Sequence, residues 1–137
     1  MNGVGPSRRL LLAIGTPGGH GILQTTAQMI ANVIDFDLNV QAAIEAPRLR
    51  CALPPGEDPI YHLIGGPDPS ERGSLVVMED RVGLEVRAEL ERRGHRIALL
   101  GDWSAVVGGG QGVLVDPETG ARSGGADPRR DGYALAY

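Results

Sequence analysis

The amino-acid sequence predicts an α+β fold, with strands and helices in mixed order around one core. An apolar run at residues 10–14 precedes a glycine turn and a helical stripe, and a strand, helix and strand pattern returns over residues 75–100. The length of 137 residues suits one compact domain. The 21 glycines and 10 prolines indicate many tight turns.

The first unit of the chain predicts a strand, a glycine turn and a helix. Leu10 to Ile14 is continuously apolar and stops at Gly15, which favours a strand buried on both faces. After the turn, apolar residues recur at helical spacing, which predicts a helix with a wide buried face. The stripe consists of Leu23, Ala27, Ile30 and Ile34, with Ile22, Met29 and Val33 beside it.

A second, short helix is predicted over Val40 to Ala46. Asn39 is a suitable N-cap, and Pro47 ends the helix because it disfavours helical geometry in the residue before it. Residues 48–73 are rich in proline and glycine and show little periodicity, so we expect a long surface connection there.

The next unit is a strand, a helix and a strand. Residues 75–78 indicate a strand, residues 80–93 a helix, and residues 95–100 another strand. The apolar residues of the helix repeat every four positions, at Val82, Val86 and Leu90. Gly94 is placed to close the helix as its C′ residue.

The end of the chain predicts a hairpin. Apolar runs at residues 105–107 and 112–115 are followed by a strong turn signal at residues 116–120, which should fold the chain back on itself. The following segment, residues 124–132, is polar and glycine-rich.

Composition excludes several classes of function. The formal net charge is −4, and all basic residues are arginines that alternate with carboxylates, so we expect no nucleic-acid partner. With no lysine, neither a Schiff-base lysine nor a Walker-type lysine is possible. No apolar stretch approaches the roughly 20 residues of a membrane span. Residues 1–14 do not read as a signal peptide, which leaves the localisation unknown.

The turn from Gly15 to Gly21 is the sharpest candidate site. Glycines between a buried strand and a helix let backbone N–H groups converge at the positive end of the helix dipole. The N–H groups of Gly18 and Gly19 could therefore stabilise an oxyanion in acyl transfer. The alternative is a tight connection that needs glycine only for its dihedral angles. The pattern matches neither the dinucleotide fingerprint nor the P-loop.

Metal chemistry is not indicated. His20, His62 and His95 show no metal-ligand spacing, and Cys51 is the only cysteine, so we expect no metal, no cofactor and no intrachain disulfide. His20 follows the glycine pair, where it could contact a ligand, whereas the other two histidines are expected to be structural or solvated.

The remaining polar clusters supply no nucleophile. Residues 127–131 hold arginines that could clamp a carboxylate, although a solvated loop explains the same pattern. No serine of the chain sits in a nucleophile elbow. From the residues alone, the sequence predicts an oxyanion site that lacks a nucleophile.

Four segments together resemble the gamma-glutamyltransferase family, also called gamma-glutamyltranspeptidase or glutathione hydrolase. They are Gly15–Gly19, Gln28–Phe36, Asn39–Arg48 and Gly125–Gly132. Their order and spacing are similar to the C-terminal part of the family's small subunit. By this resemblance residues 10–137 form one incomplete domain, and residues 1–9 are a non-matching segment.

The resemblance implies the C-terminal portion of an N-terminal-nucleophile hydrolase, an αββα sandwich made as a precursor that cuts itself into two subunits. In the family, the threonine freed by that cut attacks a gamma-glutamyl amide such as that of glutathione, and the acyl group passes to water, an amino acid or a peptide. Gly18 and Gly19 match the oxyanion pair. Arg48, Asp127 and Arg129 match family signatures and are expected to organise the fold near the site.

The chain also departs from the family. The nucleophilic threonine and the substrate-binding serines belong upstream, so we expect no catalytic residue on this chain, an inactive isolated chain, and a missing N-terminal half or large subunit as partner. His20 stands where the family has a serine or an acidic residue, which leaves a related acylase open. A non-catalytic binding or assembly module is the further alternative. A truncated sandwich should also expose apolar surface.

Overall fold

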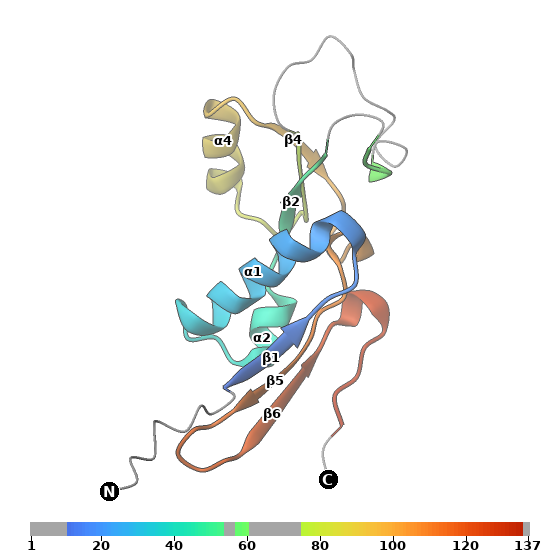
Figure 1. The fold of residues 1–137 in the computed structure, drawn as a ribbon. Helices are drawn as coiled ribbons and strands as arrows, with labels where there is room; N and C mark the ends of the chain where they lie inside the picture. The colour runs from blue at the N-terminus through green and yellow to red at the C-terminus, as the bar shows by residue number, and fades with distance from the viewer. Residues whose placement is uncertain (1–10, 54–56, 61–74, 136–137) are drawn as a thin grey trace, which may run out of the picture.

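The computed structural model describes residues 11–53, 57–60 and 75–135, which contain two three-stranded sheets (Figure 1). The first sheet has the order β1-β5-β6 and is antiparallel throughout. In the second sheet, of order β2-β3-β4, the strand β3 runs antiparallel to β2 and parallel to β4. The strands are β1 Leu12–Gly15, β2 Leu49–Cys51, β3 Leu75–Met78, β4 Arg96–Leu99, β5 Gln111–Val115 and β6 Arg122–Ala126.

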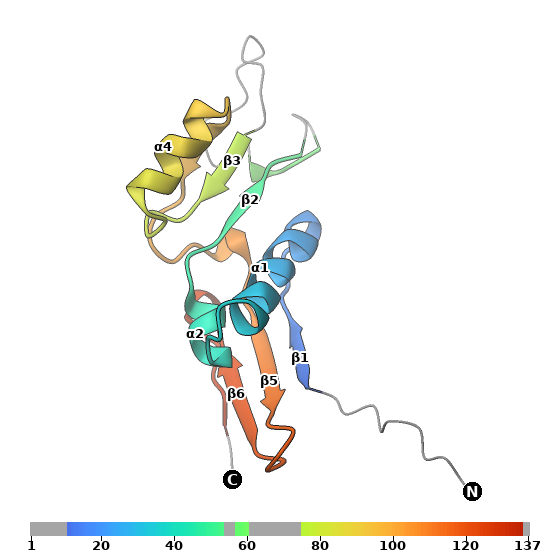
Figure 2. The same cartoon turned by 90° about the vertical axis from the view of Figure 1, so that its left-hand side faces the viewer.

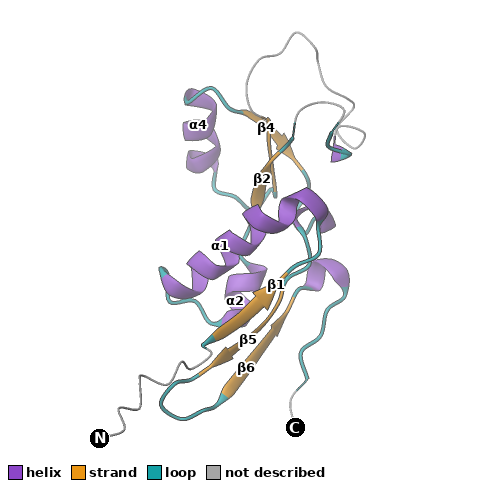
Figure 3. Ribbon diagram, viewed as in Figure 1, coloured by secondary structure: helices purple, strands orange, loops and turns teal. Residues whose placement is uncertain are grey.

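The helices lie on one face of the first sheet and beside the second (Figures 2 and 3). α1 Ile22–Ile34 packs on β1, and α2 Val40–Glu45 packs on β5 and β6. α4 Leu84–Arg92 connects the parallel strands β3 and β4 and packs on β4. Three short 3₁₀ helices complete the described part: η1 Gly19–Gly21, η2 Ala105–Val107 and η3 Pro128–Arg130. The mixture of helix and sheet confirms the predicted α+β class.

Two clusters form the core of the described residues. Under α1 and α2, Met29, Val40 and Ile44 are buried together, and Leu12, Ile14 and Leu114 of the first sheet pack against them. The second sheet carries a separate cluster of Ile60, Leu75 and Val77. The opposite face of the first sheet is covered by no helix or strand of the described residues, so this part of the chain contains one helical layer on one sheet layer (Figures 1 and 2).

The prediction that the first strand is buried on both faces is wrong. Side chains of β1 alternate between half-buried and exposed, and Leu11 just before it is 46% exposed. Leu12 and Ile14 face the helices, whereas Ala13 faces the uncovered side. A continuous apolar run indicates two covered faces, and the described residues cover one of them.

The helix α1 is where the sequence predicts it, but its buried face is not. Thr25 and Met29 are its buried residues. Leu23 is 83% exposed and Ile34 60% exposed, although both belong to the predicted buried stripe. More of the surface of α1 is apolar than the described neighbours cover. The apolar periodicity therefore predicted the helix correctly but predicted the wrong side of it to be buried.

The second helix confirms its predicted start. Asn39 is extended at the N-cap, and its side chain accepts a hydrogen bond from the N–H of Ala42 at 2.9 Å. The helix ends one residue before the predicted end, because Ala46, which precedes Pro47, is extended.

The predicted surface connection contains a strand. β2 lies at its start and pairs with β3, with Leu49 opposite Met78. Three residues are too few to show a period, and their partner strand lies far along the chain, so the sequence pattern concealed this strand. Residues 54–56 and 61–74 of the connection lie outside the described residues.

The remaining elements largely follow the sequence. Gly94 has a φ of +88° after α4, and the N–H of His95 donates to Leu90 at 3.0 Å, which is a Schellman-type closure. The predicted hairpin is present between β5 and β6. The run at residues 105–107 is a 3₁₀ helix, and the segment expected to be a polar tail begins inside β6.

Candidate functional site

The glycine turn connects β1 to α1. Gly18 has a φ of +150° and Gly19 a φ of +53°, and the N–H of Gly21 closes the turn on the carbonyl of Gly18 at 3.0 Å. Among the described residues, no acceptor pairs with the N–H of Gly18 or Gly19. Two neighbouring donors without a protein partner at the start of a helix can bind an anionic oxygen.

A pocket of about 270 Å³ lies directly beside this turn. It is lined by Gly18, Gly19, His20 and Gly21 on one side and by Arg50, Asp58 and Pro59 on the other. The structure therefore brings the predicted glycine pair and His20 to one pocket, and it adds a charged wall that the sequence did not predict.

The opposite wall is a buried ion pair. Arg50 contacts Asp58 through both terminal guanidinium nitrogens, at 2.6 and 3.0 Å, and the two side chains are 8% and 2% exposed. Asp58 also accepts from the N–H groups of Leu53 and Ile60, each at 3.0 Å. The hydrogen bond from Arg50 and these backbone bonds hold the pKa of Asp58 far below its ordinary value, so this carboxyl is ionised at neutral pH.

This wall is fixed against the turn. A Cβ on Gly21 would lie 3.0 Å from Cδ of Arg50, so the arginine stem lies directly on the turn. Gln24 of α1 donates to the carbonyl of Cys51 and accepts from its N–H, at 3.1 and 2.8 Å. Gln28 makes the same pair of bonds with Leu49, at 2.7 and 3.1 Å. Two glutamine side chains of α1 thus hold the free edge of β2.

The other side of the turn lies on the segment Gly108–Gly110. The N–H of Gly109 donates to Oγ1 of Thr16 at 2.8 Å, and this hydroxyl donates to the carbonyl of Pro17 at 2.9 Å. A Cβ on Gly108, which has a φ of +95°, would overlap the Thr16 hydroxyl. The close approach requires glycine, and it fixes the residues that lead into Gly18.

A buried ionic network supports this segment from below. The N–H of Gly110 donates to Oδ2 of Asp127 at 2.7 Å, and Asp127 also binds Arg48. Arg129 contacts Asp127 at 3.1 Å and Glu79 at 2.6 Å. These four charged side chains are at most 1% exposed.

Hydrogen bonding sets the charges in the network. Burial alone would raise the pKa of Glu79 and of Asp127, but bonds from Arg129 and Arg48 and from backbone N–H groups outweigh it, and both pKa values lie below the ordinary ones. Burial would lower the pKa of Arg129, but its bonds to Glu79 and Asp127 raise it. Burial lowers the pKa of Arg48 more than its hydrogen bond to Asp127 raises it. Glu79 and Asp127 are therefore ionised at neutral pH, and Arg129 is protonated.

The arginines thus lie behind the site and not in its pocket. Arg48, Asp127 and Arg129 contact the Gly108–Gly110 segment or its supports, and none of them lines the pocket beside the glycine turn. Glu79 is the member that sequence reasoning missed. The signal was a carboxylate directly after an apolar strand, which a single sequence does not distinguish from a surface residue.

The described residues offer no other chemistry at this site. They contain no group of three or more His, Cys, Asp or Glu side chains that could hold a metal ion. Within the described ranges, no helix is both long and apolar enough to cross a membrane. His95 lies in the turn between α4 and β4, whereas His62 lies outside the described residues.

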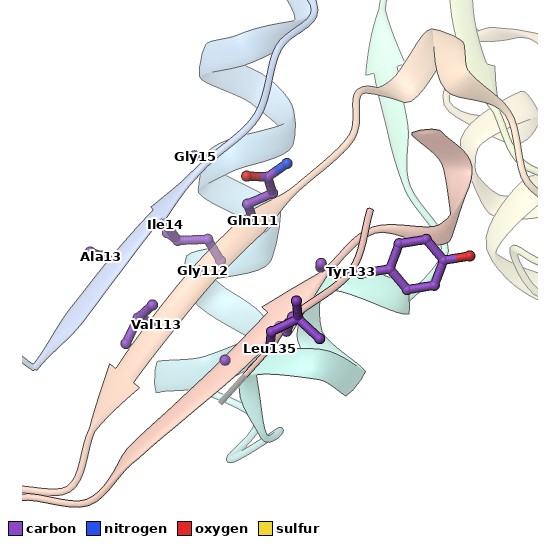
Figure 4. A pocket seen from close by; sticks show the side chains of 12 residues that line it. Ala13, Ile14, Gly15, Gln111, Gly112, Val113, Tyr133 and Leu135 are labelled. Atoms are coloured by element: carbon purple, nitrogen blue, oxygen red, sulfur yellow. The ribbon is translucent and has the colours of Figure 1, made fainter. Parts of the chain in front are cut away.

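A wider hollow of about 510 Å³ lies on the uncovered face of the first sheet (Figure 4). Ala13, Gln111 and Val113 form its floor, and Tyr133 and Leu135 lie beside it, 87% and 90% exposed. The floor consists mainly of small or apolar side chains, as expected for a face that packs on another sheet. The prediction of exposed apolar surface is confirmed.

The fold is that of part of an N-terminal-nucleophile hydrolase. A cephalosporin acylase from Bacillus halodurans is similar with a TM-score of 0.69 and 32% identity, over 90% of this chain and 19% of the other. The gamma-glutamyltranspeptidase from Pseudomonas nitroreducens, complexed with L-DON, has a TM-score of 0.69 and 25% identity, over 98% of this chain and 59% of that one.

The family follows from the sequence comparison. The family model described as Gamma-glutamyltranspeptidase matches residues 4–137, and the chain belongs to this family. It is 32% identical to the glutathione hydrolase proenzyme of Escherichia coli, over 93% of this chain and 21% of that protein. The chain thus spans about a fifth of the length of such relatives. The predicted boundary at residue 10 stays a prediction.

Proposed function

We propose that this chain is part of a gamma-glutamyltransferase or glutathione hydrolase, which transfers a gamma-glutamyl group from glutathione or a related amide to water, an amino acid or a peptide. The observation that carries the proposal is the pair of unpartnered N–H groups at Gly18 and Gly19, beside a pocket, in a member of this family. A polypeptide segment outside this sequence supplies the nucleophilic threonine.

The proposed chemistry is acyl transfer. The threonine hydroxyl adds to the carbonyl carbon of the amide while its own amino group takes the proton, and the carbonyl oxygen becomes an oxyanion. The N–H groups of Gly18 and Gly19 donate to that oxygen. Collapse of the intermediate expels the protonated amine and leaves an ester, which water or an acceptor amine then cleaves to restore the threonine. His20 contacts the substrate from the pocket wall.

The first experiment is hydrolysis of a gamma-glutamyl anilide by the purified chain, alone and mixed with the polypeptide encoded directly upstream. Activity that appears only in the mixture supports the proposal. Activity of the chain alone would refute the assignment of the nucleophile to another segment, and inactivity in both would refute the enzymatic proposal.

A matched pair of variants tests the glycine turn in that mixture. Gly19 and Gly94 both have a positive φ, and both have open space where a Cβ would lie. Alanine costs similar backbone strain at both positions, so similar melting temperatures are expected. Relief of that strain would move the N–H of Gly19 from its position, so Gly19→Ala should lower kcat, by up to about the 100-fold that loss of one oxyanion donor costs. Equal activity of Gly19→Ala and Gly94→Ala would remove the glycine pair from the mechanism.

A second candidate keeps the family and changes the acyl group. The similarity to a cephalosporin acylase and the histidine at position 20 favour an amide substrate other than gamma-glutamyl. Rates on gamma-glutamyl and aliphatic acyl anilides in the same mixture separate the two candidates. A His20→Ser variant that shifts the ratio of these rates would identify His20 as the selecting residue.

A further inference from the structure

Arg50 carries a hydrogen-bond donor that no described residue uses. The side chain is 7% exposed, and its Nη1 and Nη2 nitrogens each donate to Asp58. A guanidinium also has an Nε–H group. Among the described residues none accepts a hydrogen bond from Nε of Arg50. Buried donors are normally paired, so an unpaired donor on a buried cation marks a place where a ligand can bind.

This donor lies at the glycine turn. Arg50 lines the pocket of about 270 Å³ together with the glycine pair. A Cβ on Gly21, the N-cap of α1, would lie 3.6 Å from Nε of Arg50. Within the described residues, the fully enclosed side-chain atoms that have no partner are Oγ1 of Thr26 and Nε of Arg48, so Nε of Arg50 retains access to the pocket. The pocket therefore has a side-chain donor beside its two backbone donors.

The carboxylate of Asp58 has no capacity left for a ligand. Its Oδ1 accepts from Arg50 and from the N–H of Ile60, and its Oδ2 accepts from Arg50 and from the N–H of Leu53. A carboxylate has about four lone-pair sites, and all of them are used here. The wall of Arg50 and Asp58 therefore presents a donor to the pocket and no acceptor. Such a wall favours a carbonyl or carboxylate oxygen and disfavours an ammonium group.

The acyl part of a gamma-glutamyl substrate does not match this wall. Its carboxylate and its ammonium group are attached to one carbon, so the ammonium would lie beside a guanidinium without an acceptor. The leaving amine does match the wall, because the carbon next to the scissile nitrogen carries a carbonyl in a peptide and a carboxylate in an amino acid. The pocket is smaller than the roughly 300–1,000 Å³ of a whole ligand site, which suits the scissile carbonyl and one short group of this kind.

We propose that Arg50 is a specificity-determining residue whose Nε–H donates to this oxygen of the leaving amine, while Gly18 and Gly19 bind the scissile carbonyl. Amides of peptides and amino acids are then preferred, and simple alkyl amides are poor substrates. An accepting amine is selected in the same way, because its attack is the reverse of the departure of the leaving amine. The inference rests on the proposed function, since it assigns one part of that substrate to this pocket.

The first test compares two amides in the mixture with the polypeptide encoded directly upstream. Gamma-glutamyl-alaninamide and gamma-glutamyl isopropylamide differ in that a methyl group replaces the carboxamide. Neither leaving amine carries an acidic group, so an unpaired Asp58 repels neither of them. Arg50→Met should lower the ratio of their kcat/KM values at least about 10-fold, which is the effect of losing one hydrogen bond to a charged group. A merely structural disturbance would lower both kcat/KM values alike.

Asp58→Asn is the matched control variant. It disturbs the same wall but retains the Nε–H of Arg50, so it should not lower the ratio of the two kcat/KM values. A fall as large as that of Arg50→Met would overturn the proposal, because the ratio would then report the ion pair and not the donor.

An acetate titration of the free chain tests the pocket without activity. Acetate supplies a carboxylate oxygen, whereas methylammonium supplies only a donor. The NMR signals of the Nε–H of Arg50 and of the amides of Gly18 and Gly19 should shift along one binding curve with acetate and should not shift with methylammonium. In the Arg50→Met variant, the two glycine amides should need a several-fold higher acetate concentration for the same shift.

The outcomes separate this inference from the proposed function. The inference is overturned if acetate moves the glycine amides but not the Nε–H of Arg50, if acetate moves none of these signals, or if Arg50→Met lowers both kcat/KM values equally. In the last case the proposed function still holds, since both amides are hydrolysed. A mixture that hydrolyses neither amide refutes the proposed function, and the acetate titration then decides whether Arg50 binds an oxygen in this pocket.

Discussion

Replacement of Glu79 by glutamine is expected to destabilise the chain strongly. Oε1 of Glu79 accepts from the N–H of Ser104 at 3.0 Å and from Nε of Arg129 at 2.6 Å. Oε2 accepts from the N–H of Arg48 at 3.0 Å, Nη2 of Arg81 at 3.0 Å and Nη2 of Arg129 at 2.6 Å. A glutamine retains one of the two oxygens, so it leaves at least two of these donors without an acceptor.

The magnitude follows from those contacts. Loss of one hydrogen bond to a charged group and one hydrogen bond to a backbone N–H costs about 2–4.5 kcal/mol. Removal of one partner of a buried ion pair costs about 3–5 kcal/mol. We therefore expect Glu79→Gln to lose about 3–5 kcal/mol, a large share of the roughly 5–15 kcal/mol that stabilises a domain.

The assay is urea unfolding followed by fluorescence. The chain has one tryptophan, and the guanidinium of Arg81 lies 3.5 Å from the centroid of its ring, so Trp103 reports on the network. The matched control is Glu89→Gln on α4, where the pair with Arg92 is largely exposed, and no measurable loss is expected there. A loss below about 1 kcal/mol for Glu79→Gln, at an unchanged m-value, would refute the assignment of the network as the support of the fold.

Three further outcomes are expected. The pKa values of Glu79 and Asp127 are lower in the folded chain than in the unfolded chain, where they are about 4. The stability that these carboxylates contribute is therefore complete above the unfolded pKa values and is lost as the pH falls through the folded pKa values. The free energy of unfolding, measured against pH, should decline below about pH 5 and should show no slope from these groups between pH 6 and 8. Asn39→Ala should cost about 1 kcal/mol in urea unfolding, because α2 loses its cap, and an unchanged midpoint would contradict the cap. Arg50→Met leaves Asp58 ionised without its partner, so the amides of Leu53 and Ile60, which donate to Asp58, should exchange hydrogen faster than in the parent. Equal exchange rates would show that the ion pair does not hold this wall of the pocket.

Local features of the fold could be predicted from the sequence because their causes are local. The cap at Asn39, the closure at Gly94 and the hairpin before β6 each depend on residues within about five positions of one another. The position of the glycine turn belongs to the same class, since a glycine run between a strand and a helix indicates a tight turn from neighbouring residues alone.

Burial and distant pairing could not be predicted in the same way. The stripe that includes Leu23 and Ile34 is apolar, but which apolar side faces the core depends on α2 and the sheet. The strand β2 exists because β3 pairs with it from beyond a long connection. Asp58 is paired with Arg50 through the same connection, whose composition indicates only a surface segment.

The geometry of the glycine turn is consequently a property of several distant segments. On one side Asp127 holds Gly110, and Gly109 next to it holds Thr16, so the buried charges fix the residues that lead into the turn. On the other side Arg50 lies against Gly21. The third side is β1, whose outer edge has no described neighbour. Two of the three supports are thus made by contacts within the described residues.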